Sequence, residues 1–133
     1  MAALLIIPAL AMLLVGHGVG KLSGATVVVK PLRESGFPED YYTPFGIFDL
    51  VLAGGLFLGL FFTPVGLFCL LILVPYCLLA FVFHFRAGNP QAVPMLVFGA
   101  LAAYAIYAAL NATPTPDRPD EYGDLGQFSR SEI

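Results

Sequence analysis

The 133-residue sequence has no tryptophan, few charged residues and no cluster of basic side chains. Only 11% of its residues are charged, against the roughly 25% that is typical of a soluble domain. Without a basic patch, there is no support for nucleic-acid binding. Hydrophobic residues make up 59% of the chain and gather in several long runs, so the composition places the chain among membrane proteins.

Cysteine is also scarce, since Cys69 and Cys77 are the only two and no C-x-x-C motif occurs. On one helix these thiols would lie about 12 Å apart along the axis, too far for a disulfide. This counts against a thiol–disulfide oxidoreductase, which needs two thiols within exchange distance. An iron–sulfur cluster needs more cysteines, and no glycine-rich dinucleotide motif follows a strand. We therefore expect no covalently bound cofactor.

What the sequence does contain is a set of long apolar runs. Residues 44–83 hold a single charged residue, Asp49, and are about twice as long as the roughly 20 residues that cross a bilayer. Thr63-Pro64 divides this run, because proline favours the start of a helix and disfavours helical conformation in the residue before it. We predict an all-α, membrane-embedded antiparallel four-helix bundle over residues 1–111, with helices at about 2–20, 44–62, 64–83 and 93–110.

Residues 112–133 differ sharply from the rest, because they are polar, rich in proline and carry five of the nine acidic residues. Such a segment cannot bury enough apolar surface to fold alone. We predict a disordered, solvated tail, with a docking segment for a partner protein as the alternative. Basic residues favour the connections at 21–43 and 84–92, so the positive-inside rule predicts that both termini lie outside the cytoplasm.

Glycines at four-residue spacing indicate where helices could approach each other. They are Gly16, Gly20 and Gly24 in the first run, and Gly55 and Gly59 in the second. In lipid, such spacing lets two helix backbones pack closely. If Gly16 and Gly20 face a neighbouring helix, His17 and Lys21 lie about 100° further round, at the margin of the packed face.

Six ionisable residues lie within or beside the apolar runs: His17, Lys21, Glu34, Asp49, His84 and Arg86. An ionisable group at membrane depth costs at least a few kcal/mol, so each is a candidate for a functional site. His17 and Lys21 share one helix face, where His17 could relay a proton near neutral pH. Asp49 needs a cation, and Lys21 is the nearest by topology. We predict that they pair; the alternative is that Lys21 reaches the lipid headgroups.

The predicted topology brings these six residues to one end of the bundle, as a polar mouth that could bind a ligand. The connection from residue 21 to residue 43 is longer than two antiparallel helices need, so we expect it to fold over this mouth. There it would act either as a lid or as simple interfacial packing. The two histidines do not form a metal signature, because no short His/Glu spacing supplies a third ligand.

Short motifs across residues 1–110 also carry a resemblance to a known family. They are G-K-L-S-G (20–24), E-S-G-F-P (34–38), F-G-I-F-D-L (45–50) followed by glycines, and H-F-R-A-G-N-P (84–90) before a proline-led fourth helix. Together they resemble the DoxX-like family of small four-helix integral membrane proteins. Asp49 stands where this family more often has glutamate, which keeps the charge and shortens its reach.

The resemblance implies a quinone- or lipid-facing accessory subunit of a membrane oxidoreductase system in a bacterial cell membrane. Relatives include a subunit that passes electrons from thiosulfate to quinone. The implied cofactor is a non-covalently bound quinone, and the implied partners are membrane lipid and other membrane or redox protein subunits. The alternative is a non-catalytic structural or assembly subunit of a larger membrane complex. No catalytic residue is indicated by either reading.

Overall fold

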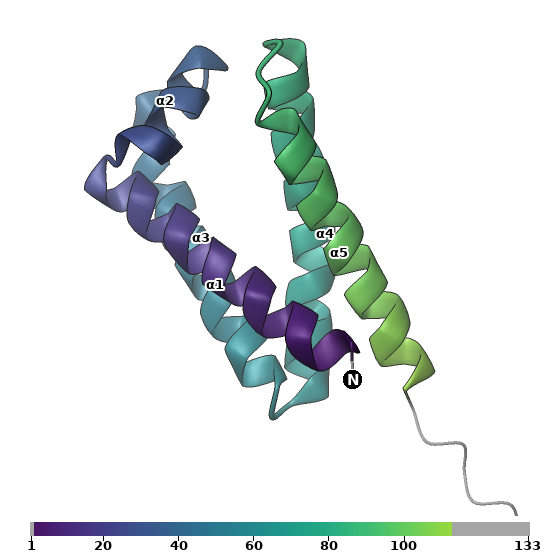
Figure 1. Ribbon diagram of the computed structural model, residues 1–133. Coiled ribbons are helices and arrows are strands. Elements are labelled where there is room, and N and C mark those ends of the chain that lie inside the picture. The colour runs from purple at the N-terminus through teal and green to yellow at the C-terminus, as the bar shows by residue number, and fades with distance from the viewer. Residues whose placement is uncertain (1, 113–133) are drawn as a thin grey trace, which may run out of the picture.

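The computed structural model describes residues 2–112, which form a bundle of helices (Figure 1). Its four long helices are each long and apolar enough to cross a membrane: α1 (Ala2–Ser23), α3 (Tyr42–Gly59), α4 (Thr63–Arg86) and α5 (Ala92–Asn111). The predicted four-helix bundle is confirmed, and its helix ends differ from the predicted ones by three residues at most. The predicted acidic tail lies outside the described residues, apart from its first residue.

Consecutive long helices run in opposite directions, so the bundle has two distinct ends (Figure 1). Helix α1 packs on α3 and α5, and α4 packs on α3 and α5, so the four long helices contact one another in a ring. The start of α1, the α3–α4 connection and the end of α5 lie at one end, which we call the hairpin end. The two other connections lie at the opposite end, which we call the polar end.

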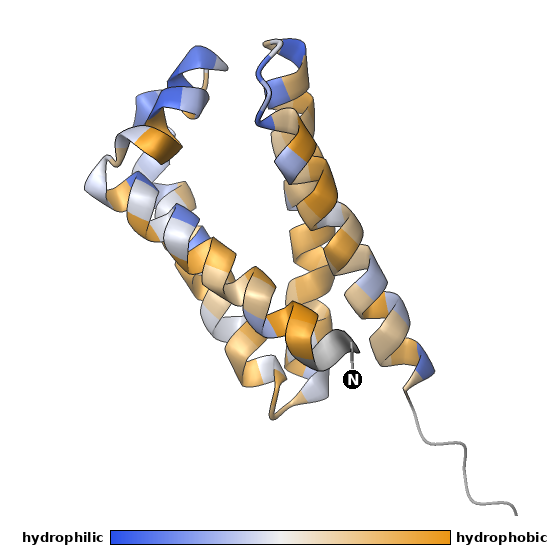
Figure 2. Cartoon of the chain, viewed as in Figure 1, coloured by the Kyte–Doolittle hydropathy of each residue, from blue (hydrophilic) through white to orange (hydrophobic). Residues whose placement is uncertain are grey.

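Most residues of the long helices are hydrophobic (Figure 2), and many large apolar ones are exposed on the outside of the bundle. The buried core is built mainly of leucine and alanine; Leu56, Ala11, Ala102 and Ala105 are fully buried. Large apolar residues such as Phe61 and Phe68 are exposed on the outer surface. A helix that is hydrophobic on all sides is expected where lipid replaces water as the solvent. Hydrophilic residues gather instead at the polar end, on the first connection and between α4 and α5.

The first connection contains a short helix, α2 (Thr26–Glu34), and a 3₁₀ turn, η1 (Glu39–Tyr41), neither of which was expected. Its apolar, β-branched start disfavours a helix by intrinsic propensity. Tertiary packing outweighs that propensity, because Val29 is buried and Val28 packs on Gly20 of α1. The chain enters and leaves α2 through glycines with positive φ, Gly24 at 70° and Gly36 at 74°. Such values suit glycine, which lacks a Cβ.

The helix contacts made by glycine differ from the predicted ones on α1. Gly16 has nothing within 4 Å of the place where a Cβ would stand, and Gly20 faces α2 rather than another long helix. The close contact between α1 and α3 is made by Gly18 and Gly46, where an added Cβ on Gly18 would stand 2.8 Å from the Gly46 carbonyl oxygen. The prediction that both glycines face a neighbouring helix was therefore wrong for Gly16 and is confirmed for Gly20, whose neighbour is the short helix α2. The second predicted pair, Gly55 and Gly59 of α3, is confirmed: Gly55 faces Cys69 of α4 and Gly59 faces the backbone of Gly66.

Candidate functional site

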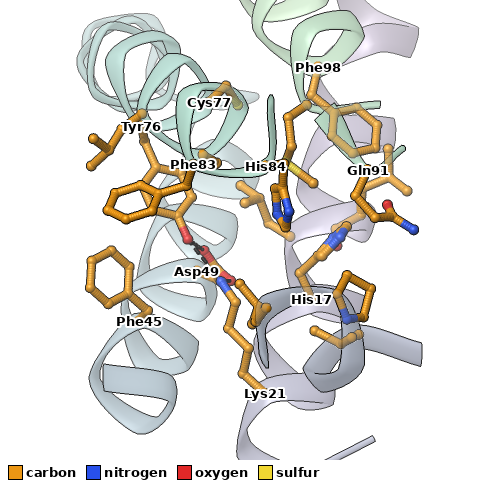
Figure 3. A pocket seen from close by; sticks show the side chains of 18 of the residues that line it. His17, Lys21, Phe45, Asp49, Tyr76, Cys77, Phe83, His84, Gln91 and Phe98 are labelled. Atoms are coloured by element: carbon orange, nitrogen blue, oxygen red, sulfur yellow. Dashed lines mark hydrogen bonds and ion pairs between the residues drawn. The ribbon is translucent and has the colours of Figure 1, made fainter. Parts of the chain in front are cut away.

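Three side chains from three helices form a closed triad at the polar end of the bundle (Figure 3). The ammonium of Lys21 donates to Asp49 Oδ2 over 2.6 Å and to the hydroxyl of Tyr76 over 2.9 Å. The Tyr76 hydroxyl in turn donates to Asp49 Oδ1 over 2.7 Å. The predicted Lys21–Asp49 pair is confirmed, with side chains only 9% and 1% exposed. The alternative, in which Lys21 reaches the headgroups, was wrong.

The local backbone explains why this pair can form between antiparallel helices. Gly18 and Gly46 mark the point of closest approach, and Lys21 and Asp49 each follow one of them by three residues. Side chains on a helix lean toward its N-terminus, so both residues lean back toward that contact. Gly46 also makes room for the lysine, because a Cβ there would stand 3.2 Å from the Cβ of Lys21.

Aromatic packing fixes the third member of the triad. Tyr76 is flanked by Phe45, whose ring centroid lies 6.0 Å away, and by Phe48, at 5.3 Å. Lys21 Nζ lies 5.6 Å from the centroid of the tyrosine ring, close enough for a cation–π interaction. Among residues 2–112, no buried side-chain nitrogen or oxygen lacks a hydrogen-bond partner. The buried charges are thus compensated within the protein, as a low-dielectric environment requires.

A cavity of ≈ 110 Å³ lies beside the triad and is lined by residues of all five helices. One water needs only about 10–15 Å³ measured in the same way, so the space is several times larger than a single water site. Its walls are mostly apolar and include the aromatic rings of Phe37, Phe45, Phe83 and Phe98. Its polar lining consists of His17, Lys21, Ser35, Asp49, Tyr76, His84 and Gln91.

His17 lies on the α1 wall of this cavity and is fixed by its own helix (Figure 3). Its Nδ1–H donates to the carbonyl oxygen of Leu13, one turn earlier, over 3.0 Å. Its ring forms a T-shaped pair with the ring of Phe98 on α5, with centroids 6.0 Å apart. Because Nδ1 is directed at the helix backbone, Nε2 lies on the opposite side of the ring. No residue within the described part of the chain bonds to that Nε2.

His84 lies on the α4 wall and is held by the end of α2. Its Nδ1 lies 2.7 Å from Ser35 Oγ, which itself lies 2.7 Å from the carbonyl oxygen of Pro31. The amide of Asn89, just beyond α4, donates to the same carbonyl over 3.1 Å and to Ser35 Oγ over 3.4 Å. We call these four residues the α2 clasp. It fastens α2 over the cavity, so the first connection folds over the polar end as predicted.

The remaining two predicted residues lie outside the cavity. Glu34 is exposed and its carboxylate lies 3.8 Å from the ammonium of Lys30, one turn earlier on α2. Arg86 is exposed at the end of α4 and is not part of the lining. Both side chains are exposed, whereas Ser35, next to Glu34, and His84, two residues before Arg86, line the cavity. The structure therefore brings together His17, Lys21, Asp49 and His84, and the predicted ligand-binding role of all six stays a prediction.

Sequence reasoning missed the contribution of Tyr76 and of the α2 clasp. Tyr76 lies inside a long apolar run, where a buried tyrosine hydroxyl usually has a hydrogen-bond partner. This rule, together with the need of Asp49 for a partner, could have indicated that Tyr76 bonds to the acid. Ser35 and Asn89 lie in connections, and no periodicity places such residues. No group of three or more histidine, cysteine or acidic side chains that could hold a metal ion occurs among residues 2–112.

This arrangement can bind an apolar ring with polar substituents, because apolar walls surround a few fixed polar groups. Two imidazoles can accept or donate protons there, whereas the described lining offers no activated nucleophile. Among known proteins, no curated protein and no solved structure matches the chain. A family model does match, over residues 5–106, with the description DoxX-like family. With its four apolar helices, the chain is thus a membrane protein and belongs to the DoxX-like family.

Proposed function

We propose that the protein binds a quinone-class molecule in the cavity at the polar end and serves as an accessory subunit of a membrane oxidoreductase system. The observation that carries this proposal is the cavity itself, with aromatic and aliphatic walls and a fixed polar lining within a membrane protein. A quinone has a flat ring that packs against aromatic side chains and oxygens that need hydrogen-bond partners. The chain itself has no cluster of cysteines for an iron–sulfur centre, so electrons would come from a partner protein.

The lining of the cavity includes hydrogen-bond donors and acceptors that could hold such a ring. Lys21 has three N–H donors, of which two are used in the triad, and Gln91 adds an amide to the lining. These donors suit the carbonyl oxygens of a quinone, and the imidazoles suit its hydroxyl-bearing reduced form. The chemistry that a bound quinone would supply is the uptake and release of two electrons and two protons. The residues of this chain would bind it, orient it and exclude bulk water.

We also propose that the polar end faces the cytoplasm, which puts both termini on the other side. Lys30, Arg33 and Arg86 belong to the polar end, and Lys21 does not count because it is buried in the triad. Within residues 2–112, the hairpin end carries no lysine or arginine. Basic residues next to membrane helices favour the cytoplasmic side.

A binding experiment with a filled cavity tests the proposed function. The full chain, purified in mild detergent, is titrated with a short-chain benzoquinone, and the bound fraction is measured by equilibrium dialysis. Ala80 lines the cavity, so Ala80→Phe is expected to reduce binding at least tenfold by occupying its volume. Ala100 is exposed on α5, and Ala100→Phe adds the same side chain outside the cavity, so binding should not change. Equal binding to both variants would refute a quinone site in this cavity.

The accessory role is tested by co-purification after gentle extraction of the native membrane. The proposal expects quinone and a redox-active partner protein to remain with the wild-type chain, and the quinone to be lost with Ala80→Phe. If partner proteins are retained but quinone is absent from both the wild-type and the Ala80→Phe preparations, the chain is a structural or assembly subunit instead.

A further inference from the structure

The hydrogen bonds of the two histidines specify which proton each imidazole carries. A carbonyl oxygen only accepts, so the contact with Leu13 requires a proton on Nδ1 of His17. In the neutral ring, Nε2 of His17 is then a bare acceptor. Because Nδ1 is the engaged atom, it is this acceptor that is left for the cavity.

For His84, the number of protons available in the α2 clasp determines which ring nitrogen is protonated. Ser35 has one hydroxyl proton and two short contacts, to the carbonyl of Pro31 and to Nδ1 of His84. The carbonyl cannot supply a proton, so the serine must donate to it. Nδ1 of His84 must then carry the proton of the other contact and donate to Ser35 Oγ. Nε2 of His84 is therefore also a bare acceptor.

Both histidines line one cavity (Figure 3), and each uses Nδ1 for its hydrogen bond, so no described residue bonds to either Nε2. A ligand that only accepts hydrogen bonds, such as a ketone or an ether, would bury both Nε2 atoms without a proton. A polar atom left without a partner on burial costs about 1–3 kcal/mol. A hydroxyl group avoids this cost, because it can donate to an imidazole and accept from the spare N–H of Lys21 or from Gln91.

The apolar side chains that line the cavity indicate which kind of molecule would carry this hydroxyl group. Phe45, Phe83 and Phe98 line the cavity together with Tyr76 and with aliphatic side chains, and the aromatic part of this lining favours a flat ring that can stack or pack edge-to-face. We propose that the cavity binds an apolar molecule with a hydroxyl group on an aromatic ring, the class of phenols and quinols, in preference to its carbonyl or ether counterpart. This inference rests on the proposed function and names the redox form that the site prefers.

In this account Ser35 is a positioning residue, because it acts on the ligand only through His84. It sets the proton on Nδ1 and so keeps Nε2 free to accept. Removing its hydroxyl should allow the proton to move to Nε2, which would turn the acceptor into a donor. A merely structural serine would change stability without changing which nitrogen is protonated.

The test compares 4-octylphenol with its methyl ether, which has the same ring and chain but no hydroxyl proton. The full chain is labelled with ¹⁵N-histidine in detergent micelles, and its two histidines are assigned with His17→Gln and His84→Gln. In the free protein at a pH where both rings are neutral, we expect Nδ1 to be protonated and Nε2 unprotonated in both. The phenol should shift the Nε2 resonances and bind about tenfold more tightly than the ether, the value of roughly one hydrogen bond.

Control ligands and variants make each outcome informative. Ser35→Ala should lower the preference for the phenol and shift the His84 proton toward Nε2, whereas Glu34→Gln, next to it and outside the cavity, should change neither. A quinol that binds more tightly than its quinone extends the preference to the redox pair, and dodecanol should bind more weakly than the phenol. Equal affinity for phenol and ether, or Nε2 protonated in the free protein, would overturn the inference and leave the quinone proposal standing. If neither ligand nor a benzoquinone binds, both proposals fail.

Discussion

The two ends of the bundle are closed by different means, although both use glycine. At the hairpin end, Gly59 and Gly66 bring the backbones of α3 and α4 into direct contact, and residues 2–112 place no charged residue near them. At the polar end, the glycine contact lies between α1 and α3, and its effect is to seat Lys21 against Asp49. The hairpin end is closed by direct contact between glycine backbones. The polar end is held by long polar and aromatic side chains, which leave a cavity between the helices.

This difference indicates how a small membrane bundle can combine closely packed helices at one end with an internal cavity at the other. Without a hydrophobic effect between helices in lipid, close packing of small residues stabilises the contact at the hairpin end. The triad contributes the corresponding contact at the polar end, because its groups are buried and have few alternative partners. The cavity persists where aromatic rings and the α2 clasp, rather than small residues, separate α4 and α5 from α1. The stability of each end should therefore respond to different substitutions.

Breaking the ion pair at the polar end should have the largest effect. Lys21→Met leaves Asp49 buried without a cation, and we expect it to lower the free energy of unfolding by about 3–5 kcal/mol. Adding Asp49→Asn removes the unpaired charge and should restore much of that loss. Unfolding in mixed micelles with increasing denaturing detergent measures both changes.

Lys30→Met is the matched control, because it breaks the exposed pair with Glu34 on α2. An exposed pair contributes only about 0–1 kcal/mol, so this variant should unfold nearly as the wild type does. If Lys21→Met is equally mild and its effect simply adds to that of Asp49→Asn, the triad is not what holds the polar end together.

A smaller effect is expected from the third member of the triad. Tyr76→Phe removes one hydroxyl that bonds to both charged groups, and hydrogen bonds to charged groups contribute about 1.5–3 kcal/mol. The free energy of unfolding should fall by that amount. Tyr104 is exposed on α5, so Tyr104→Phe should have no measurable effect under the same conditions. A Tyr76→Phe protein as stable as Tyr104→Phe would show that the ion pair does not depend on the hydroxyl.

A substitution at the hairpin end should lower the stability of the protein without changing its affinity for the ligand. The Cβ of Gly66→Ala would overlap the backbone of Gly59, and overpacking of this kind costs about 1–3 kcal/mol. Gly54, on the facing helix α3, has open space at its Cβ position and provides the control as Gly54→Ala. Ligand affinity measured below the unfolding range should be the same in both variants. Reduced affinity in Gly66→Ala alone would mean that the two ends are coupled.

Much of the fold could be predicted from the sequence, because long apolar runs and one proline break fix the number and order of helices. The Lys21–Asp49 pair could be predicted for a similar reason: topology left one acid inside a run and one cation near it. Helix α2 could not, since it is held by the packing of Val28 and Val29, which local propensity does not report.

The cavity could not be predicted, because it depends on how far apart two pairs of helices stand. Its triad needed Tyr76, which lies 27 positions beyond Asp49 and meets it only through the α3–α4 contact. The α2 clasp joins residues about 50 positions apart, and serine and asparagine in connections have too many alternative roles to be placed by pattern. Glu34 and Arg86 were included since they lie near the same end, but nearness in sequence does not decide which way a helix end faces.

The smallest effect tests the rotation of α1, on which the position of both His17 and Lys21 depends. Gly16 has open space around its Cβ position, so Gly16→Ala should stabilise the protein by about 0.5–1 kcal/mol through better helix propensity. Gly18→Ala, two residues on, should destabilise it instead, because the new methyl group would meet the backbone of Gly46 and the side chain of Leu50. The opposite signs of two identical substitutions, measured by the same unfolding assay, fix the face of α1 that packs on α3. If Gly16→Ala is the harmful one, α1 is turned by about 200° from its place in the structure, and Lys21 would then face away from Asp49.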